Sequence, residues 1–199
     1  MMQDAYRGAL ESIDRIVNRE READEVLRKV VAALHDRFEH YSWVGIYLVE
    51  ADDLVLGPWK GPAATEHVRI PIGQGICGAA AASARTEIID DVNADERYLA
   101  CFPSTRSEIV VPIAFEGRVV GEIDIDSDMP AAFGPADRTF LERVAVLVSP
   151  HCLVAWDAPS AWAERVGGDA ETTSSERGDG PTVAGPARRA GRRGPSPAR

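Results

Sequence analysis

The sequence predicts an α+β fold in which helices pack against an antiparallel β-sheet. Segments with helical periodicity stand near both ends of the folded region, and segments rich in β-forming residues lie between them. Two pairs of these β segments are separated by only a few turn residues, and such hairpins produce antiparallel sheet. The chain has 199 residues, 45% of them hydrophobic, which is enough for one domain with a buried core.

The N-terminal region 4–39 is predicted to be helical because its apolar residues recur three and four positions apart. This spacing places the apolar side chains on one side of each helix, where they can pack against the sheet. Two apolar stripes carry the pattern: Ala5, Leu10, Ile13, Ile16 and Val17 in the first, and Val26, Leu27, Val30, Val31, Leu34 and Phe38 in the second.

Three strands are predicted to follow these helices. Residues 42–50 are rich in β-formers, and the turn residues 51–53 separate them from 54–57, so the two segments form a hairpin. Residues 67–72 alternate as a third strand. Pro71 lacks the N–H that a sheet ladder uses, so it indicates the end of that strand or an edge position.

A glycine-rich turn and a long loop come next. The turn at 73–78 leads into the alanine run 79–84, a pattern that predicts the start of a short helix. Residues 90–107 then form a long loop with several turn formers. Loops of this length in a compact domain are usually functional or disordered.

A second hairpin and a final helix complete the predicted domain. The hairpin strands are 108–115 and 119–126, and the segment 135–153 returns to helical periodicity. Beyond it, Gly, Pro, Ala, Ser, Thr and Arg dominate, so 157–199 is predicted to be a disordered tail. The sequence therefore divides into one domain, 1–156, and that tail.

The charge of the chain argues against nucleic-acid binding. The formal net charge is −10, and residues 1–180 hold 17 basic against 32 acidic residues. A domain this acidic repels phosphate backbones. No apolar run is long enough to span a bilayer, and the N-terminus lacks the basic and apolar regions of a signal peptide. We therefore expect a soluble cytoplasmic protein with no nucleic-acid or membrane partner.

The three cysteines, Cys77, Cys101 and Cys152, are too few for the disulfide framework of a small secreted protein. No CxxC motif is present and no histidines stand at ligand spacing, so no metal site is expected. Cys77 stands where a helix begins, and the free N–H groups there favour a thiolate. Cys101 lies in the long loop. Composition alone favours buried structural thiols, with redox-active thiols as the alternative.

Three acidic residues are candidates for a charged pocket. Asp124 and Asp126 flank Ile125 on a predicted strand, so their side chains point to one face. Glu108 opens the neighbouring strand. A solvated face is the usual place for such an acidic pair. In a pocket, like charges would instead raise a carboxyl pKa and provide both a proton donor and a receptor for an ammonium group.

Two aromatic residues share one face of the predicted sheet. Trp43 and Tyr47 lie four residues apart on a strand, and side chains separated by an even number point to the same side. They fit a core contact between sheet and helix. They also fit the apolar wall of a pocket, with the Tyr47 hydroxyl as a polar handle.

Taken together, these segments resemble a known family, the free methionine-(R)-sulfoxide reductases, which are single GAF-domain enzymes. The resemblance covers about Asp4 to Val154, nearly the whole predicted domain. Its most specific part combines a Gly-x-Gly-x-Cys-Gly segment, a second cysteine and an Asp-Ile-Asp-Ser strand. The matching segments are 43–47, 54–58, 69–78, 100–101, 107–112 and 124–127.

The resemblance implies a thiol mechanism. Cys101 corresponds to the nucleophile and Cys77 to the resolving thiol. Attack on the sulfoxide sulfur of free L-methionine-(R)-S-oxide would leave a sulfenic acid on Cys101, which Cys77 converts to an intramolecular disulfide. Thioredoxin would then reduce the disulfide, so no bound cofactor is expected and the reducing power comes from an external thioredoxin/NADPH system.

The resemblance also implies a substrate pocket. Glu108, Asp124 and Asp126 correspond to the acidic residues that bind the free amino acid and its sulfoxide oxygen. Trp43 and Tyr47 correspond to pocket aromatics. A carboxylic acid of this pocket would protonate the departing oxygen.

The chain departs from the family pattern at two positions. Phe102 and Pro103 follow the predicted nucleophile where many members have Asp, and Glu87 stands where some members have a further cysteine. The first departure motivates an alternative function, a GAF module that binds a small molecule or senses oxidants without catalysis.

Two expectations concern assembly and the remaining cysteine. Symmetric dimers are the commonest soluble oligomers, and the long amphipathic N-terminal region offers an interface, so a homodimer is expected. Cys152 lies on the final helix beside Leu147, Val148 and Leu153, which mark that helix as core-facing, and we expect it to be structural.

Overall fold

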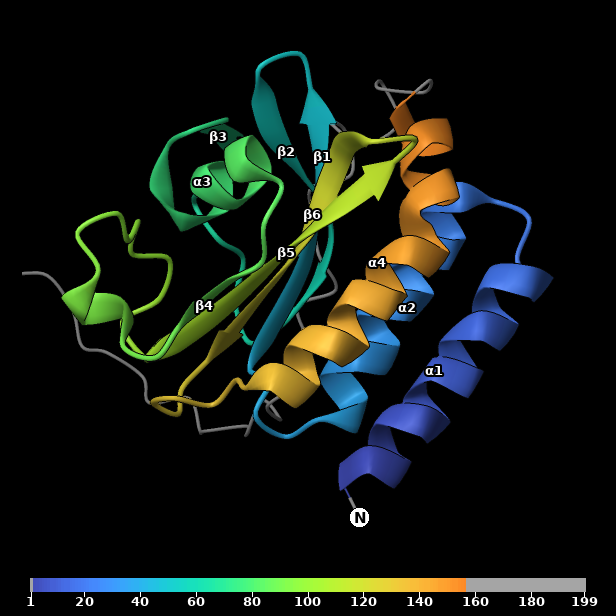
Figure 1. Ribbon diagram of the computed structural model, residues 1–199, viewed down its shortest axis with the longest axis horizontal. Helices are drawn as coiled ribbons and strands as arrows, with labels where there is room; N and C mark the ends of the chain where they lie inside the picture. Colours follow the sequence, from blue (N-terminus) through green and yellow to red (C-terminus); the bar gives the residue numbers. More distant parts are fainter. Residues whose placement is uncertain (1, 157–199) are drawn as a thin grey trace, which may run out of the picture.

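Within residues 2–156, six strands form one antiparallel sheet in the order β3-β2-β1-β6-β5-β4 (Figure 1). The computed structural model describes residues 2–156, so the predicted tail at 157–199 lies outside the described residues. In chain order the elements are α1 (Met2–Arg19), α2 (Ala23–Arg37), β1 (Trp43–Glu50), β2 (Asp53–Lys60), β3 (Arg69–Pro71), α3 (Gly75–Ser83), β4 (Glu87–Ile89), the 3₁₀ turn η1 (Val92–Ala94), β5 (Ser107–Phe115), β6 (Arg118–Ser127) and α4 (Pro135–Trp156).

The predicted α+β architecture is confirmed, and most elements lie where the periodicity placed them. The N-terminal region contains two helices, each with its own apolar stripe. Pro71 is the last residue of β3, which is an edge strand of the sheet, as its missing N–H indicated. The sequence did not predict β4 or η1, because three-residue segments are too short to show a period.

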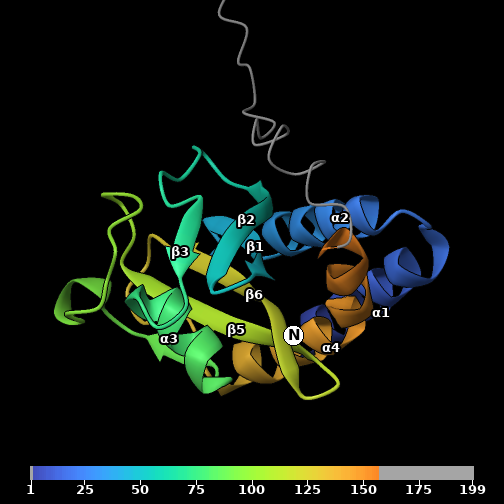
Figure 2. The same ribbon diagram turned by 90° about the horizontal axis from the view of Figure 1, so that it is seen from above.

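Alternation along the strands gives the sheet two faces with different partners. Helices α2 and α4 cover one face, and α1 packs on these two helices on the side away from the sheet, as seen in Figure 1 and from above in Figure 2. Every second strand residue points into this helix-covered core, which is apolar. The strand side chains in it are Val44, Ile46, Leu48, Ile109, Val111, Ile113, Ile123 and Ile125.

One buried carboxylate ties the helical layer together. Asp137, in the first turn of α4, accepts hydrogen bonds from the hydroxyls of Tyr6 (2.7 Å) and Tyr41 (2.9 Å) and from the N–H of Gly134 (2.9 Å), and the His40 ring lies 3.3 Å away. Burial alone would raise the pKa of Asp137, but these partners hold it at about 2. The carboxylate therefore joins α1, α4 and the segment after α2 in its charged form.

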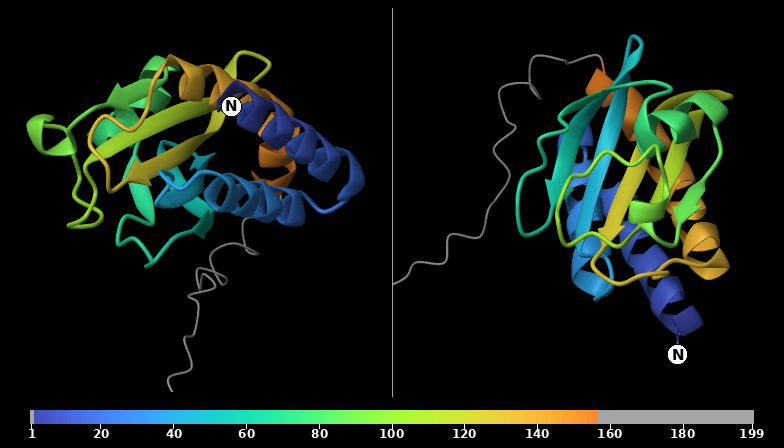
Figure 3. Two further views of the ribbon diagram at one scale, coloured as in Figure 1. Left: turned by 90° about the horizontal axis from the view of Figure 1, so that it is seen from below. Right: turned by 90° about the vertical axis from the view of Figure 1, so that its left-hand side faces the viewer.

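The opposite face carries α3 and the loop 90–106 (Figure 3, right). Its apolar contacts come from Leu54, Leu56 and Ile70 of the sheet and from Ile76 and Ala80 of α3. This second layer is smaller than the helical one. It also contains the polar side chains described in the next subsection.

The glycines between β3 and α3 serve a tight chain reversal. Gly73 has a φ of +93°, and its N–H donates to the carbonyl of Gly78 at 2.8 Å. A Cβ on Gly78 would lie 2.5 Å from the carbonyl oxygen of Pro71, so no larger residue fits there. The turn brings the first residues of α3 down onto the sheet, and its close backbone approach explains the glycine-rich segment.

No helix among residues 2–156 is both long enough and apolar enough to cross a membrane.

Candidate active site

Four buried carboxyl groups gather on the α3 face of the sheet. Glu122, Asp124 and Asp126 alternate along β6, so all three side chains point to that face. Glu108 of β5 stands directly opposite Asp126 in the register. The exposed fractions of the four residues are 0 to 5%. The solvated face that the sequence alone favoured for the acidic pair is therefore wrong, because α3 and the loop 90–106 cover it.

Glu122 is the member of this cluster that the sequence reasoning missed. It stands two residues before Asp124, and the same period of two that relates Asp124 to Asp126 could have found it. Neither Glu122 carboxyl oxygen has a hydrogen-bond partner among the described residues, and the same holds for one oxygen of Asp124. Buried polar groups are normally paired, so this cluster is an exception that points to function.

Burial controls the protonation of the cluster. It raises the pKa of Asp124 to about 7. Burial also raises the pKa of Glu108, Glu122 and Asp126 well above their ordinary values, with the neighbouring Asp124 carboxylate as the next cause in each case. Near neutral pH the cluster therefore holds protons that it can donate, and a cation bound beside it would favour the deprotonated carboxylates.

Trp43 and Tyr47 lie on the same face of β1, in the smaller core with Cys77. In the register Trp43 stands opposite Asp126 and Tyr47 opposite Glu122. The Tyr47 hydroxyl donates a hydrogen bond to the carbonyl of His67 at 2.8 Å. This hydrogen bond therefore holds the segment after β2 against the sheet.

The Trp43 indole lies close to the backbone at two glycines. A Cβ on Gly45 would lie 2.3 Å from this ring, and a Cβ on Gly61 would come equally close. Trp59 stacks on Trp43 with 6.2 Å between ring centroids, and Phe102 approaches at 6.1 Å. The three rings form an apolar wall beside the carboxyl groups. Only Trp43 of the three was a predicted pocket aromatic.

Cys77 reaches the cluster from the first turn of α3. Its Sγ lies 3.7 Å from a carboxyl oxygen of Glu108, and the side chain is 7% exposed. The helix-start argument favoured a thiolate here, but burial raises the pKa of Cys77, and the carboxyls of Asp124, Glu122 and Glu108 raise it further. The thiol is therefore protonated in the absence of a ligand, which corrects that expectation.

Cys101 reaches the same cluster from the loop 90–106. Leu99 packs so closely on the start of α3 that a Cβ on Gly75 would lie 2.8 Å from it, which places this part of the loop over the helix. Cys101 is half-buried, and burial raises the pKa of its thiol, with Asp124 and Asp126 as the next causes. The charges of Asp124 and Glu108 thus act on both thiols.

The third thiol lies elsewhere. Cys152 is fully buried in the core between the sheet and the helical layer, among apolar neighbours, and burial raises its pKa to about 12. All three cysteines are free in this structure. The fold therefore separates two thiols that share a polar site from one that packs as an apolar side chain.

Comparisons with known proteins identify the family of the fold. The GAF domain model matches residues 22–150. Free methionine-R-sulfoxide reductase of Escherichia coli is 38% identical over 118 residues, covering 59% of this chain and 70% of that protein. Protein YtsP of Bacillus subtilis is 41% identical over 116 residues, covering 57% and 70%.

A solved structure has a similar fold. The free methionine-R-sulfoxide reductase of Neisseria meningitidis, in complex with its substrate, is 37% identical with a TM-score of 0.71, covering 77% of this chain and 91% of that one. The chain belongs to the GAF domain family. Within that family it is an oxidoreductase similar to the free methionine-R-sulfoxide reductases.

Proposed function

We propose that this protein reduces free methionine-R-sulfoxide to methionine, with Cys101 as nucleophile and Cys77 as resolving thiol. One observation carries the proposal: two thiols from separate segments lie near one cluster of buried carboxyl groups, with Cys77 in contact with Glu108 and Cys101 close enough for the charges of Asp124 and Asp126 to act on it. A free amino acid sulfoxide presents matching groups, namely an ammonium group, a polar S–O bond and an apolar methyl group. The names of the similar reductases support the same substrate.

In the first step the Cys101 sulfur attacks the sulfoxide sulfur while a protonated carboxyl of the cluster donates to the sulfoxide oxygen. The oxygen passes to Cys101, so methionine is released and Cys101 becomes a sulfenic acid. The carboxyls Glu108, Asp124 and Asp126 hold the ammonium group and supply the proton. The cation of the substrate also lowers the pKa of nearby thiols, because it offsets the negative charge that raises it.

In the second step Cys77 attacks the Cys101 sulfenic acid. A disulfide forms between the two sulfurs and one water molecule leaves with the hydroxyl oxygen and the Cys77 proton. A dithiol of the thioredoxin class then reduces the disulfide, with NADPH as the external electron source. We place this cycle in the cytoplasm, where such reductants keep thiols reduced.

The decisive test is NADPH oxidation coupled through thioredoxin, with free methionine-R-sulfoxide as substrate. Turnover is expected for the wild type and for Cys152→Ser, the matched control on the other face of the sheet, and none for Cys101→Ser. Cys77→Ser should form one equivalent of methionine and then recycle poorly. Wild-type turnover no higher than that of Cys101→Ser would overturn the proposal.

The disulfide is tested separately. Peptide mapping of protein exposed to substrate without reductant should show a Cys77–Cys101 linkage, whereas a main species containing Cys152 would contradict the assignment. If ligand addition raises the melting temperature while turnover stays absent, the non-catalytic binding or sensing module suggested by Phe102 becomes the better function.

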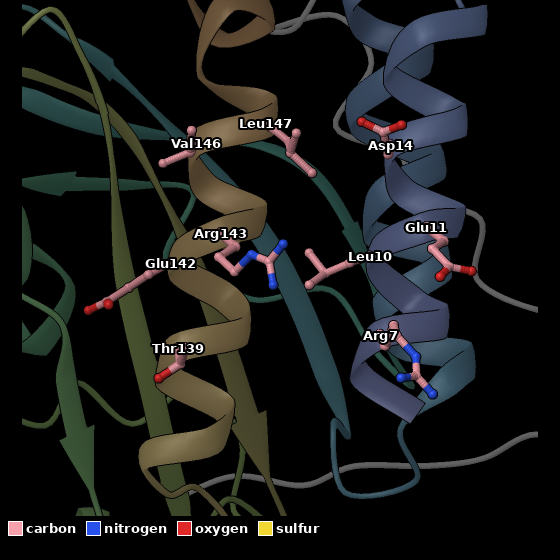
Figure 4. A pocket seen from close by; sticks show the side chains of 9 residues that line it. All are labelled: Arg7, Leu10, Glu11, Asp14, Thr139, Glu142, Arg143, Val146 and Leu147. Carbon is pink, nitrogen blue, oxygen red and sulfur yellow. The ribbon is translucent and has the colours of Figure 1, made fainter. Parts of the chain in front are cut away.

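We further propose that two copies pair through the N-terminal helical region. A groove of about 700 Å³ lies between α1 and α4, where Leu10 and Arg143 point toward each other (Figure 4). Val146 on its rim is 70% exposed, and the groove carries both acidic and basic side chains, such as Glu11 and Arg143. Mixed charges on one patch can pair across a two-fold axis.

Light scattering should show a dimer that Val146→Asp dissociates, and a wild-type monomer at micromolar concentration would refute it.

A further inference from the structure

The carboxyl cluster contains a fourth acid, Glu122, that the proposed substrate binding does not use. Glu122 is fully buried, stands opposite Tyr47 in the register, and both of its carboxyl oxygens are unpartnered. It lies close enough to Cys77 and Asp124 for its charge to act on both groups. An unpaired carboxyl costs free energy at such a site unless a donor or a cation satisfies it.

Three of the neighbouring side chains meet at one point. The Cys77 sulfur and a carboxyl oxygen each from Glu108 and Asp124 all lie within 4.8 Å of one another. The free oxygen of Asp124 is among the unpartnered atoms of the cluster. Ligand atoms around a tetrahedral zinc ion stand about 3.5 Å apart, given bonds of about 2.0 to 2.3 Å. Side-chain shifts of about 1 Å would therefore close this triad around an ion.

The donor set selects the kind of metal. A thiolate is a soft ligand that Mg²⁺ and Ca²⁺ do not use, whereas Zn²⁺ takes cysteine sulfur and carboxylate oxygen together. One thiolate and two carboxylates bring three negative charges, which a divalent cation offsets. The three ligands come from α3, β5 and β6. Because these elements pack against one another, they hold the ligands close together.

We propose that the reduced protein binds one zinc ion between Cys77, Glu108 and Asp124, with Glu122 beside it, and that this ion inhibits the reductase. On binding, the Cys77 thiol and the protonated carboxyls among Glu108 and Asp124 lose their protons to solvent, and one sulfur–zinc bond and two oxygen–zinc bonds form. No electron is transferred. The inhibition rests on the proposed function, because zinc would occupy the resolving thiol and two of the substrate carboxyls.

Such a site would also respond to oxidation. A Cys77–Cys101 disulfide removes the sulfur ligand, so oxidised protein should release the ion. The sequence analysis expected no metal site because the chain has no CxxC motif. The ligands proposed here come instead from three segments that are far apart in the chain, so no short motif marks them.

The binding test uses Cd²⁺ as a probe, because a cadmium–thiolate bond gives a near-ultraviolet charge-transfer band. Full-length protein, reduced by a non-thiol reductant that is then removed, should show the band saturating at one equivalent. Zinc should abolish the band by competition. Cys152→Ser and Cys101→Ser should keep it, Cys77→Ser should lose it with an unchanged far-ultraviolet dichroism spectrum, and Asp124→Asn should bind at least tenfold more weakly.

Failure of this proposal and failure of the reductase assignment give different results. A protein that turns over substrate but shows no band, or a band that survives Cys77→Ser, overturns the zinc site alone. Because Cys101→Ser cannot turn over yet should bind cadmium, the site is tested without catalysis. For inhibition, methionine formed in a single turnover should fall at least tenfold with one equivalent of zinc and recover with a chelator. Unchanged formation would overturn inhibition.

Discussion

A single buried acid, Asp137, and the carboxyl cluster of Glu108, Glu122, Asp124 and Asp126 lie on opposite sides of one sheet, and the fold gives them opposite surroundings. On the helical face, Asp137 is surrounded by donors from four residues and has a pKa of about 2. On the α3 face, Glu122 and Asp124 retain unpartnered oxygens, and the pKa of Asp124 is raised to about 7. Burial alone would raise the pKa of both carboxyls, so the difference lies in the donors.

This contrast separates a structural acid from a functional one. The donors of Asp137 come from segments that must be held together, so its charge stabilises the folded chain. The α3-face cluster has few donors of its own, so its charge is left for a ligand to satisfy. The surroundings of a buried acid, rather than its burial, therefore indicate what it does.

The largest expected effect on this comparison comes from Asp137→Ala. The change leaves two tyrosine hydroxyls and a backbone N–H without their acceptor, and it should lower the free energy of unfolding by about 3 kcal/mol. Urea denaturation at pH 7 measures it. Activity per folded molecule should be unchanged. A loss below about 0.5 kcal/mol would mean that Asp137 does not hold the helices together.

Neutralising the other group should affect activity instead. Asp124→Asn and Glu108→Gln should each lower kcat/KM for free methionine-R-sulfoxide about ten- to hundredfold, because each removes a charge-assisted hydrogen bond worth about 1.5 to 3 kcal/mol. The matched control is Asp52→Asn, in the exposed turn after β1, which should change nothing. Equally small effects at all three positions would show that the cluster does not bind substrate.

The pH dependence of stability should have opposite signs for the two groups. The folded-state pKa of Asp137 is lowered from 3.8 to about 2, so its contribution is present above pH 4 and is lost as the pH falls toward 2. The pKa of Asp124 is raised from 3.8 to about 7, so stability falls as the pH rises from 4 to 7.

A difference experiment isolates the second effect. The unfolding free energy of Asp124→Asn should exceed that of the wild type by about 1 to 2 kcal/mol at pH 8, and the two should converge near pH 4. Denaturation curves across this range measure the gap. A gap that does not change with pH would show that titration of Asp124 does not cause the loss of stability between pH 4 and 7.

The smallest expected effect tests how much each donor contributes to stabilising the charged form of Asp137. Tyr41→Phe removes one hydroxyl from Asp137 but leaves Tyr6, His40 and Gly134 in place. The expected loss is about 1 kcal/mol, measured by the same denaturation experiment. A loss as large as that of Asp137→Ala would show that Tyr41 alone determines the charged state.

Periodicity in the sequence was sufficient to predict most of the fold. The spacing of Val26, Leu27, Val30 and Leu34 fixed a helix face, and the alternation in β6 fixed which side chains point together. It could not say which face is covered, since a period of two fits a solvated and a buried face equally. Coverage comes from α3 and the loop 90–106, which are placed by contacts distant in sequence.

The electrostatics of the site were harder to predict for the same reason. At Cys77 the local rule considered only the helix start and favoured a thiolate. The carboxyls that reverse that preference come from β5 and β6. The nearest of them in sequence, Glu108, lies 31 residues after Cys77. A pKa inside a fold depends on neighbours that only the tertiary structure supplies.

The alternating sequence of β6 has a consequence for folding fidelity. If β6 shifted by one residue between β1 and β5, Glu122, Asp124 and Asp126 would turn into the core that holds Leu27 and Leu34, and Ile123 and Ile125 would leave it. Each carboxyl buried among aliphatic side chains costs several kcal/mol, so every mispaired sheet of this kind is strongly disfavoured. The acids that weaken the native state therefore help the chain to reject misaligned strands as it folds.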